Sequence, residues 1–577
     1  MQQEFDPVTL TVILNKLDTI SREMGIIMTR SSQTPIFSES HDFSCFLADA
    51  QGRLISQADG IPIHTGGGGF AVRALRSYWG DDINPGDVFL SNDPYIAGGN
   101  HLPDWVIFRP VFFEGRAIAF ACNRAHQVDI GGGAPGTYNV LATEIFHEGL
   151  RLPPVKLYEG AKVRRDLLDV IRTNTRRPDA VVGDLGAMIG STLVGARRLE
   201  AMCAEYGGAA LQRYFSALLD YSEQRMRQAI ETIPDGTYRA QESMNNDCFS
   251  EAEVSIHVTL RKAGSDLEVD FTGTSPQIVA FKNSSLANTH SAVYVGVSTL
   301  FDPEIPHNEG SYRMISIVAP EGTVVNPRPP APLTYCTVFP AHEIIHCIWK
   351  ALAPVLPSRV SAGWGKSANP ISVCRNEPLY HWHCLPAAGA VDGRDGFEQF
   401  GVLPSLGGLV VPNVETYEQC YPAEFERWEL RTDGGGAGKY RGGTGAECVV
   451  RILEMATHVF RAEGLRTASG FGICGGLDGT PGVNEIAEGS AGLRPAPPYG
   501  IMTTGPCTLR LRSAGGGGWG DPFDRDPNAV RDDVLDGLVT VESARNDYGV
   551  ILDPFSANVD TEGTNDLRQR RREERRH

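Results

Sequence analysis

The chain has 577 residues, of which 41% are hydrophobic and 21% charged, a balance typical of a folded protein with about two to four domains. Its net charge of −18 argues against a surface for nucleic acid or an anionic membrane, because phosphate groups would repel it. Glycine, at 64 residues, exceeds the usual share of ~7%, so much of the backbone must form tight turns or lie close to other groups.

The sequence shows no sign of export or of a membrane anchor. Its first ten residues, MQQEFDPVTL, lack the basic segment and apolar run of a secretory signal. No uninterrupted apolar run approaches the ~20 residues that a membrane helix needs. The 12 cysteines include no Cys-x-x-Cys pair, as expected for reduced thiols. We therefore expect a cytoplasmic protein that binds neither membrane nor nucleic acid.

The first part of the chain predicts a helix, a sheet and then more helices. Apolar residues at helical spacing predict an opening helix over residues 7–30. Residues 42–56 predict a hairpin around an Asp-Ala-Gln-Gly turn, and short strands separated by Gly and Pro follow through residue 155. Two long helical patterns between residues 164 and 232 predict a helical hairpin packed on the preceding sheet.

The second part is mostly strand and loop. The alternating stretch VSIHVTLRKAGSDLEVDF predicts a β-hairpin, and residues 283–300 predict an apolar helix. Residues 320–520 are rich in Gly and Pro and carry the clusters TDGGGAGKYRGGTG and SAGGGGWGDP. Two short helices are predicted after them. The basic tail RQRRREERRH, residues 568–577, predicts a solvated or disordered end.

These elements predict an α+β, multi-domain mixed fold in which β-rich regions carry an inserted long helical hairpin. Four segments are expected along the chain. They are an N-terminal α/β metal-site region at 1–163, the helical hairpin at 164–232, a Gly/Pro-rich β-rich region at 233–513 and a C-terminal segment with a disordered tail at 514–577.

One histidine motif is typical of zinc peptidases. His342, Glu343 and His346 form a His-Glu-x-x-His string, which on a helix puts two imidazoles on one face beside a general base. No third ligand follows within a turn or two, and Pro354 and Pro357 would cut the helix short. The favoured interpretation is a helix end whose histidines bond nearby carbonyl groups.

A second motif places His381 and His383 two residues apart in an expected strand. Alternate strand residues share a face, so both imidazoles would reach one ion. No acidic partner lies close in sequence, which favours a structural role.

A third constellation carries metal-ligand spacing. His101 and Asp104 are three residues apart in NDPYIAGGNHLPDW, and His126 and Asp129 are three apart in CNRAHQVDIGGG. Two histidines and a carboxylate leave coordination positions open for water and substrate, as catalytic Zn, Mn or Fe sites require. Loop histidines and turn-forming aspartates would give the same pattern, so spacing alone leaves the two interpretations open.

These stretches resemble the hallmark segments of the hydantoinase B/oxoprolinase family, which is similar to the large subunit of acetone-type carboxylases. The resemblance runs along nearly the whole chain. Its other segments are DPVTLTVILNKL, EIFHEGLRLPPVKLY, APEGTVVNPRPPAP, ELRTDGGGAGKYRGGTG and GGGGWGDPFDRDPNAV.

The resemblance implies a catalytic divalent metal, Zn, Mn or Fe, held by His101, Asp104 and His126. An aspartate of the early hairpin is similarly placed in relatives to join the site, which here is Asp42.

Further roles are implied around these ligands. Asp129 would orient an imidazole and fix its tautomer. Glu144 and Glu148 are candidate general bases or further ligands, with ordinary surface carboxylates as the alternative. The chain departs from the family pattern at Gln127, where many relatives carry histidine, and in HTGGGGF at 64–70, which is unusually rich in glycine.

Nothing in the sequence predicts an ATP site. DGGGAGKY, residues 433–440, imitates a phosphate loop, but Asp433 and Tyr440 stand where that loop needs Gly and Ser or Thr. The resemblance implies that ATP is used by a separate hydantoinase A-type subunit or a fused domain. We expect that subunit as a partner in a hetero-oligomer such as α2β2.

The expected function is therefore the metal-containing subunit of an ATP-dependent cyclic-amide hydrolase of the hydantoinase, 5-oxoprolinase or lactamase type. Water activated by the metal would attack a carbonyl that the partner has phosphorylated. The alternatives are a subunit of an ATP-dependent ketone carboxylase, a zinc peptidase using His342, Glu343 and His346, and a non-catalytic scaffold for an active partner.

Overall fold

The computed structural model describes residues 5–553 and 556–575. The chain forms two compact units, Met1–Ala351 with Pro404–Val410, and Leu352–Leu403 with Val411–His577. Both contain helices and separate sheets, which confirms the α+β, multi-domain class. The boundary between residues 351 and 352 lies inside the predicted segment 233–513, so the first unit takes in the first two predicted segments and part of the third. The finer division into four segments stays a prediction.

The first unit is built on a seven-stranded antiparallel sheet with the strand order β2-β1-β5-β4-β3-β6-β7. The hairpin predicted at residues 42–56 is confirmed as β1 and β2. The central strands are buried along almost their whole length, because both faces of the sheet are covered. The strands are β1 (Phe43–Asp49), β2 (Leu54–Gly60), β3 (Val88–Ser91), β4 (Asp104–Phe113), β5 (Arg116–His126), β6 (Val155–Glu159) and β7 (Lys162–Val163).

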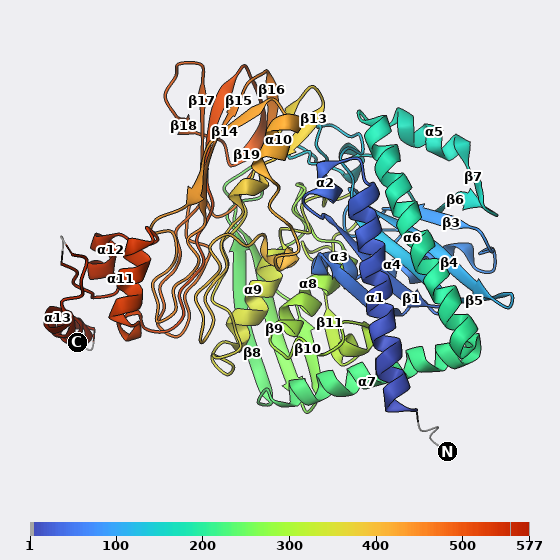
Figure 1. Ribbon diagram of the computed structural model, residues 1–577, viewed down its shortest axis with the longest axis horizontal. Coiled ribbons are helices and arrows are strands. Elements are labelled where there is room, and N and C mark those ends of the chain that lie inside the picture. The colour runs from blue at the N-terminus through green and yellow to red at the C-terminus, as the bar shows by residue number, and fades with distance from the viewer. Residues whose placement is uncertain (1–4, 554–555, 576–577) are drawn as a thin grey trace. The chain divides into compact units, whose positions relative to one another are not determined.

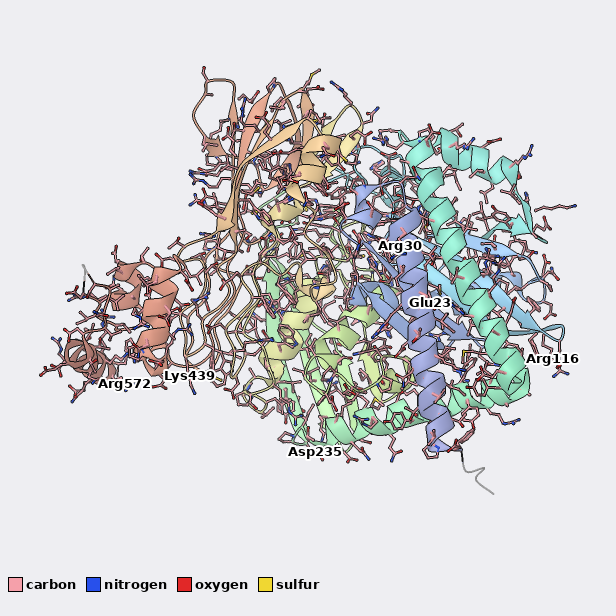
Figure 2. The ribbon with its side chains drawn as sticks, in the orientation of Figure 1. Glu23, Arg30, Arg116, Asp235, Lys439 and Arg572 are labelled. Atoms are coloured by element: carbon pink, nitrogen blue, oxygen red, sulfur yellow. The ribbon has the colours of Figure 1, made fainter. Side chains whose placement is uncertain are left out.

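Two long helices lie side by side on this sheet, α1 (Pro7–Ser31) and α6 (Pro178–Tyr206) (Figure 1). The Asp6 carboxylate caps α1 by accepting the N–H groups of Val8 and Thr9. Glu23 of α1, labelled in Figure 2, pairs with Arg198 of α6 at 2.8 Å. Helices are confirmed across residues 164–232 as α5 (Arg165–Thr173), α6 and α7 (Gly208–Glu231), but α6 packs mainly against α1 and the sheet rather than against α7.

Within the described residues, α6 is the one helix long and apolar enough to cross a membrane by length and composition. Half of its most apolar stretch is buried inside the protein. Its contacts with α1, β4 and β5 account for this burial, as in the core helix of a globular domain.

A second, four-stranded sheet completes the first unit, with the order β11-β10-β9-β8. The predicted β-hairpin is confirmed as β9 and β10, and the predicted apolar helix as α8. The strands are β8 (Gly236–Met244), β9 (Val254–Ala263), β10 (Asp266–Asp270) and β11 (Ile315–Val318). The shorter helices are α2 (Pro35–Ser38), α3 (Pro62–Thr65), α4 (Gly68–Trp79), α8 (Leu286–Ser298) and α9 (Ala341–Leu352).

The second unit holds two antiparallel sheets, ordered β13-β12-β16-β19 and β14-β15-β20-β17-β18. All 12 cysteines of the chain are free thiols, as predicted. The strands are β12 (Ile371–Cys374), β13 (Glu377–Tyr380), β14 (Ala423–Leu430), β15 (Ala446–Ile452), β16 (Ala456–Arg461), β17 (Val483–Glu488), β18 (Arg494–Pro495), β19 (Tyr499–Thr504) and β20 (Cys507–Arg512). The helices are α10 (Val414–Cys420), the two predicted short helices α11 (Pro527–Leu535) and α12 (Val541–Asn546), and α13 (Thr561–Glu574).

The glycine clusters of this unit pack against one another as extended runs. Gly516 donates its N–H to Gly443 O, and Gly443 donates to Ala388 O. A Cβ at Gly516 would lie 2.0 Å from Ala388 O. The clusters therefore carry glycine because neighbouring backbones touch at positions where no side chain fits.

The prediction of a disordered tail is wrong for the described residues 568–575. This segment continues α13, and Arg568 donates to the carbonyls of Tyr548 and Arg525. Arg572, labelled in Figure 2, pairs with Asp524 at 2.6 Å. The basic residues fold because partners elsewhere in the unit accept their hydrogen bonds, a fact that charge alternation does not reveal.

Candidate metal centre

Three ends of neighbouring strands carry the predicted ligands. Asp104 begins β4 and His126 ends β5, and the two residues are direct antiparallel partners. Asp42 directly precedes β1, and its carbonyl accepts the N–H of His126 at 3.1 Å. Side chains of paired residues lie on the same face of a sheet, so the topology brings together groups from three strands.

His101 joins them from the turn before β4. Its Nε2 lies 2.7 Å from Asp104 Oδ1, and His126 Nδ1 lies 3.3 Å from the same oxygen. Within the described ranges, His101, Asp104 and His126 are the one group of three His, Cys, Asp or Glu side chains whose ligand atoms all lie within 4.8 Å. All three side chains are buried.

Hydrogen bonds aim both imidazoles at the carboxylate. His101 Nδ1 faces the Thr334 carbonyl, which only accepts, so this nitrogen carries a hydrogen. Thr137 donates its hydroxyl hydrogen to Gly136 O and so accepts from His126 Nε2 at 3.0 Å. In each neutral ring the other nitrogen then presents a lone pair to Asp104.

An imidazole lone pair and a carboxylate oxygen are both hydrogen-bond acceptors and repel each other. Contact between them therefore requires a positive charge in between. His101 Nε2 is buried and makes no well-angled hydrogen bond within the described part of the chain. Burial alone would raise the pKa of Asp104, but attraction to His101 and His64 holds it well below its usual value. Burial would lower the pKa of His101, yet Asp104 raises it. A proton on His101 meets this demand in part, whereas a divalent cation fits all three donors at once.

Glu148 supports the His101 imidazole indirectly, through the backbone of Thr334. Its Oε1 accepts the N–H groups of Leu333 and Thr334 at 2.8 and 2.7 Å. Thr334 is the residue whose carbonyl faces His101, so Glu148 holds the group that sets the tautomer of this imidazole. Burial raises the pKa of Glu148 to about 7, against the opposing effect of these hydrogen bonds.

Two predicted carboxylates lie elsewhere. Asp129 was expected to orient an imidazole, but it accepts hydrogen bonds from Gly131, Thr175 and Arg176 and pairs with Arg176 at 3.1 Å. It therefore ties the triple-glycine loop to the link between α5 and α6. Glu144 is exposed and precedes a short 3₁₀ turn, Ile145–His147. This position agrees with the alternative prediction, an ordinary surface carboxylate.

The other histidine motifs form no comparable group in the described residues. His342, Glu343 and His346 lie buried on α9, and His346 Nδ1 is 3.8 Å from Glu242, but no third ligand completes a cluster. The peptidase geometry is thus not found on this helix.

His381 and His383 do not lie in a strand as expected, because β13 ends at Tyr380 and a 3₁₀ turn follows. His381 contacts Ser372 at 2.8 Å and His383 contacts Pro412 O at 2.8 Å. These contacts give both histidines the structural role that was favoured.

One residue near the centre carried no predicted role. His64, in α3, is buried and its Nε2 lies 3.3 Å from Asp104 Oδ2. Burial lowers its pKa to about 4. Its only signal in the sequence was that it begins the glycine-rich departure HTGGGGF.

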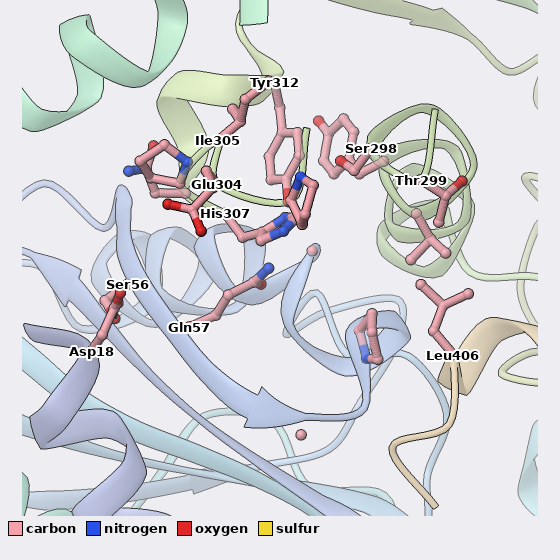
Figure 3. Close-up of a pocket in the computed structure, with 18 of the residues that line it drawn as sticks. Asp18, Ser56, Gln57, Ser298, Thr299, Glu304, Ile305, His307, Tyr312 and Leu406 are labelled. Carbon is pink, nitrogen blue, oxygen red and sulfur yellow. Dashed lines mark hydrogen bonds between the residues drawn. The ribbon is translucent and has the colours of Figure 1, made fainter. Parts of the chain in front are cut away.

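A cavity of about 800 Å³ lies in the first unit (Figure 3). Pro62 and Gly66, which flank His64, form part of its wall. Gln57, Ser298 and Tyr312 contribute polar groups, and Figure 3 shows them converging from different elements.

Comparison with known proteins extends these observations. The model of the family described as Hydantoinase B/oxoprolinase matches residues 6–522. The beta subunit of caprolactamase from Pseudomonas jessenii is 32% identical over 95% of this chain and 96% of its own length. A protein of a Pseudomonas species, named as the B-type subunit of a D-/L-hydantoinase, is 34% identical over 98% of both chains.

Solved structures agree on the fold. The crystal structure of the ATP-dependent caprolactamase from Pseudomonas jessenii matches with a TM-score of 0.91 at 32% identity, covering 98% of this chain and all of that one. Nucleotide-free acetone carboxylase matches with a TM-score of 0.88 at 21% identity, covering 99% of this chain and 83% of that one. At this identity the second likeness concerns the fold alone.

Proposed function

The chain belongs to the hydantoinase B/oxoprolinase family, and from this premise we propose that it is the metal-containing hydrolytic subunit of an ATP-dependent enzyme that opens cyclic amides. The observation that carries the proposal is the convergence of His101, Asp104 and His126 on one buried point. Two imidazoles and a carboxylate are the donor set of hydrolytic metal sites with open positions.

The chemistry divides between two subunits. A cyclic amide resists attack because resonance makes its carbonyl carbon a poor electrophile, and phosphorylation of the amide oxygen by the partner removes this resistance. A divalent cation, when bound, supplies a Lewis acid that lowers the pKa of water from ~15.7 towards ~7.

The residues of this chain supply orientation and a proton acceptor. His101, Asp104 and His126 would hold the cation, and Glu148 and Thr334 keep the His101 ring in place. The Asp42 side chain is 13% exposed, whereas that of Asp104 is 0% exposed. Asp42 does not belong to the cluster of three donors, so we propose it as the acceptor of the proton that the attacking water releases rather than as a ligand.

The proposal includes a partner. The two relatives described above are named as the beta and B-type subunits of their enzymes, and the most similar solved structure described above is an ATP-dependent enzyme. We propose a hydantoinase A-type ATP-binding subunit in a hetero-oligomer such as α2β2, and Zn, Mn or Fe as the cation. A ketone carboxylase rests on fold likeness alone, and we propose no peptidase because α9 offers no third ligand among the described residues.

The test is reconstitution of the full chain with a hydantoinase A-type subunit, ATP and labelled bicarbonate. The substrates are caprolactam, hydantoin and 5-oxoproline. We expect a ring-opened amino acid or carbamoyl amino acid with matching release of ADP and phosphate. Carbon label in the product would identify a carboxylase instead. The matched variants are His101→Ala, which should abolish turnover, and His147→Ala, an exposed histidine that should leave it unchanged. Equal turnover in both would favour the scaffold alternative.

A further inference from the structure

The cavity of Figure 3 gathers uncharged polar side chains that take no part in the metal centre. Gln57 comes from β2, Ser298 ends α8, and Tyr312 ends a 3₁₀ turn, Glu309–Tyr312. The volume of about 800 Å³ lies within the ~300–1,000 Å³ that is usual for small-molecule sites. Three separate parts of the first unit thus supply one polar wall.

Two of these side chains have unused hydrogen-bonding capacity. Gln57 Oε1 and Ser298 Oγ are buried atoms, and neither makes a well-angled hydrogen bond with a residue that the structure describes. Burial raises the pKa of Tyr312 to about 12, and Gln57 and Ser298 lie close enough to its hydroxyl to oppose this rise. Buried polar atoms without partners are costly, so this group of three side chains suits a ligand that pairs with them.

The tyrosine of this group is held in place by a second ring. Tyr312 stacks on Tyr294 of α8, with 4.0 Å between the ring centroids and 4° between the ring planes. Figure 3 shows the Tyr312 and Gln57 side chains pointing towards each other from opposite walls. With its raised pKa, the Tyr312 hydroxyl keeps its hydrogen at neutral pH and remains a donor.

The chemistry of a carboxamide indicates which ligand fits. Gln57 offers an acceptor oxygen and donor hydrogens side by side, and its broad terminal torsion allows this edge to turn into the cavity. In open-chain secondary amides the N–H and C=O groups point in opposite directions, because the trans form is strongly favoured. A small ring forces the amide to be cis and puts both groups on one edge. A lactam or hydantoin therefore pairs with Gln57 through two hydrogen bonds at once.

The rest of the wall suits the hydrocarbon part of such a ring. Its apolar members include Leu14 of α1, Val295 of α8 and Leu406, the last of them labelled in Figure 3. The charged residues Arg22 and Glu304 also line the cavity but are exposed, so water solvates their charges. A neutral ring with one amide edge divides into polar and apolar surface as this cavity does.

One turn of the chain contributes both to the cavity and to the metal centre. Pro62 and Gly66 belong to the cavity wall. His64, between them in sequence, places its Nε2 3.3 Å from Asp104 Oδ2. A ring bound in the cavity would therefore contact the segment whose side chain reaches the centre.

We propose that this cavity is a binding site for neutral cyclic amides, in which the Gln57 carboxamide pairs with the cis-amide edge of the ring. The hydroxyl of Tyr312 or Ser298 donates to the second lone pair of the ring carbonyl. The choice of ligand rests on the proposed function, which makes cyclic amides the substrates, whereas the site itself lies outside the metal centre.

The test is binding of caprolactam and N-methylcaprolactam, which lacks the N–H donor, to the full chain without partner or ATP and with a chelator present. A ligand-observed NMR titration measures both affinities. We expect the wild type to bind caprolactam about 10-fold more tightly than its N-methyl analogue, because the analogue leaves the Gln57 oxygen unpaired. Gln57→Leu should bind caprolactam about 10-fold more weakly than the wild type and lose the preference. Gln51→Leu, at an exposed glutamine between β1 and β2, is the matched control and should behave as the wild type does.

The outcomes separate this site from the proposed function. A wild type that binds neither lactam, or both equally, would overturn the site and leave the proposed function intact, since turnover with the partner is measured separately. A preference that survives in Gln57→Leu would overturn the pairing with Gln57. The wild-type comparison decides even if Gln57→Leu fails to fold. Gln57-dependent binding without ring opening in the reconstituted enzyme would instead support the site and refute the proposed function.

Discussion

Asp104 and His126 stand directly opposite each other in the antiparallel pair β4–β5, and Asp104 Oδ1 lies 3.3 Å from His126 Nδ1. The two residues are 22 positions apart in the chain. Their meeting depends on the register of two long strands. The next strand, β1, brings Asp42 to the same edge.

Replacing His101 and His126 together by Ala should remove the bound cation. Two of the three donors are then lost. The affinity for the cation should therefore fall by well over the ~100-fold that is typical when a group that only orients a ligand is removed. Elemental analysis per chain measures this. The comparison variant, His342→Ala with His346→Ala, should keep its metal. Metal lost only from that variant would reinstate the peptidase interpretation.

Replacing Glu148 by Ala should weaken cation binding about 10–100-fold, because the Thr334 backbone loses its acceptor and His101 loses its fixed tautomer. Glu148→Gln keeps an acceptor oxygen and should bind more tightly than the Ala variant. Zn²⁺ titration with a chromophoric chelator ranks the Zn²⁺ affinities of the wild type, Glu148→Ala and Glu148→Gln. If Glu148 were a direct ligand instead, the Gln variant would bind as weakly as the Ala variant.

Asp184 should make stability depend on pH. Burial raises its pKa to about 6, against hydrogen bonds from Thr34 and Gln33. Between about pH 4 and 6 the unfolded state has released the proton that the folded state keeps, so raising the pH favours unfolding. Above pH 6 this penalty is constant, at most about 3 kcal/mol.

Asp184→Asn removes the titration. Relative to the wild type, the variant should therefore gain stability as the pH rises from 4.5 to 7.5. Urea unfolding midpoints at both values measure the difference. A gap between variant and wild type that does not change with pH would show that burial does not raise this pKa.

Gly516→Ala should destabilise the second unit by at least about 2 kcal/mol. A Cβ there would lie 2.0 Å from Ala388 O, and backbone atoms cannot give way as a side chain can. Gly492→Ala is the matched control, because a Cβ at that position would have no atom within 4 Å among the described residues. Thermal unfolding of the three proteins measures the effect. Equal midpoints for the two variants would contradict the close packing of the glycine runs.

Arg568→Ala should loosen α13. Arg568 is 8% exposed and donates to the carbonyls of Tyr548 and Arg525, so its loss leaves two buried acceptors without their donor. Hydrogen exchange over residues 561–574 should accelerate about 10-fold or more, equivalent to ~1.4 kcal/mol. Arg570→Ala, which removes an exposed arginine of the same helix, should change the exchange little. Equal rates in both would mean that the tail is held by something else.

Several local elements were predictable because their causes are local. The stripe of Ile13, Leu17 and Met24 specifies α1 by its own period, and the turn after Asp49 specifies the β1–β2 hairpin. His101, Asp104 and His126 were identified by their spacing together with the family resemblance, and the structure brings them together.

The predictions that failed concern residues whose partners lie far away in the sequence. Asp129 lies three residues from His126 in sequence, yet the loop turns it towards Arg176. The tail was predicted to be solvated or disordered. Residues 569, 570 and 572–575 are indeed exposed, but the segment is helical to Glu574, because carbonyls more than 20 residues away accept hydrogen bonds from Arg568 and Arg572.

By itself, then, the sequence determined the residue types of the candidate centre, the helices and strands of strong period, and the family. Only the tertiary structure decided which groups surround those residues. His64, Thr137 and Thr334 reach the centre from the segment between β2 and α4, from the loop after β5 and from a position 233 residues beyond His101. Hydrogen bonds act over about 3 Å in space and without regard to distance along the chain, so no spacing in the sequence records them.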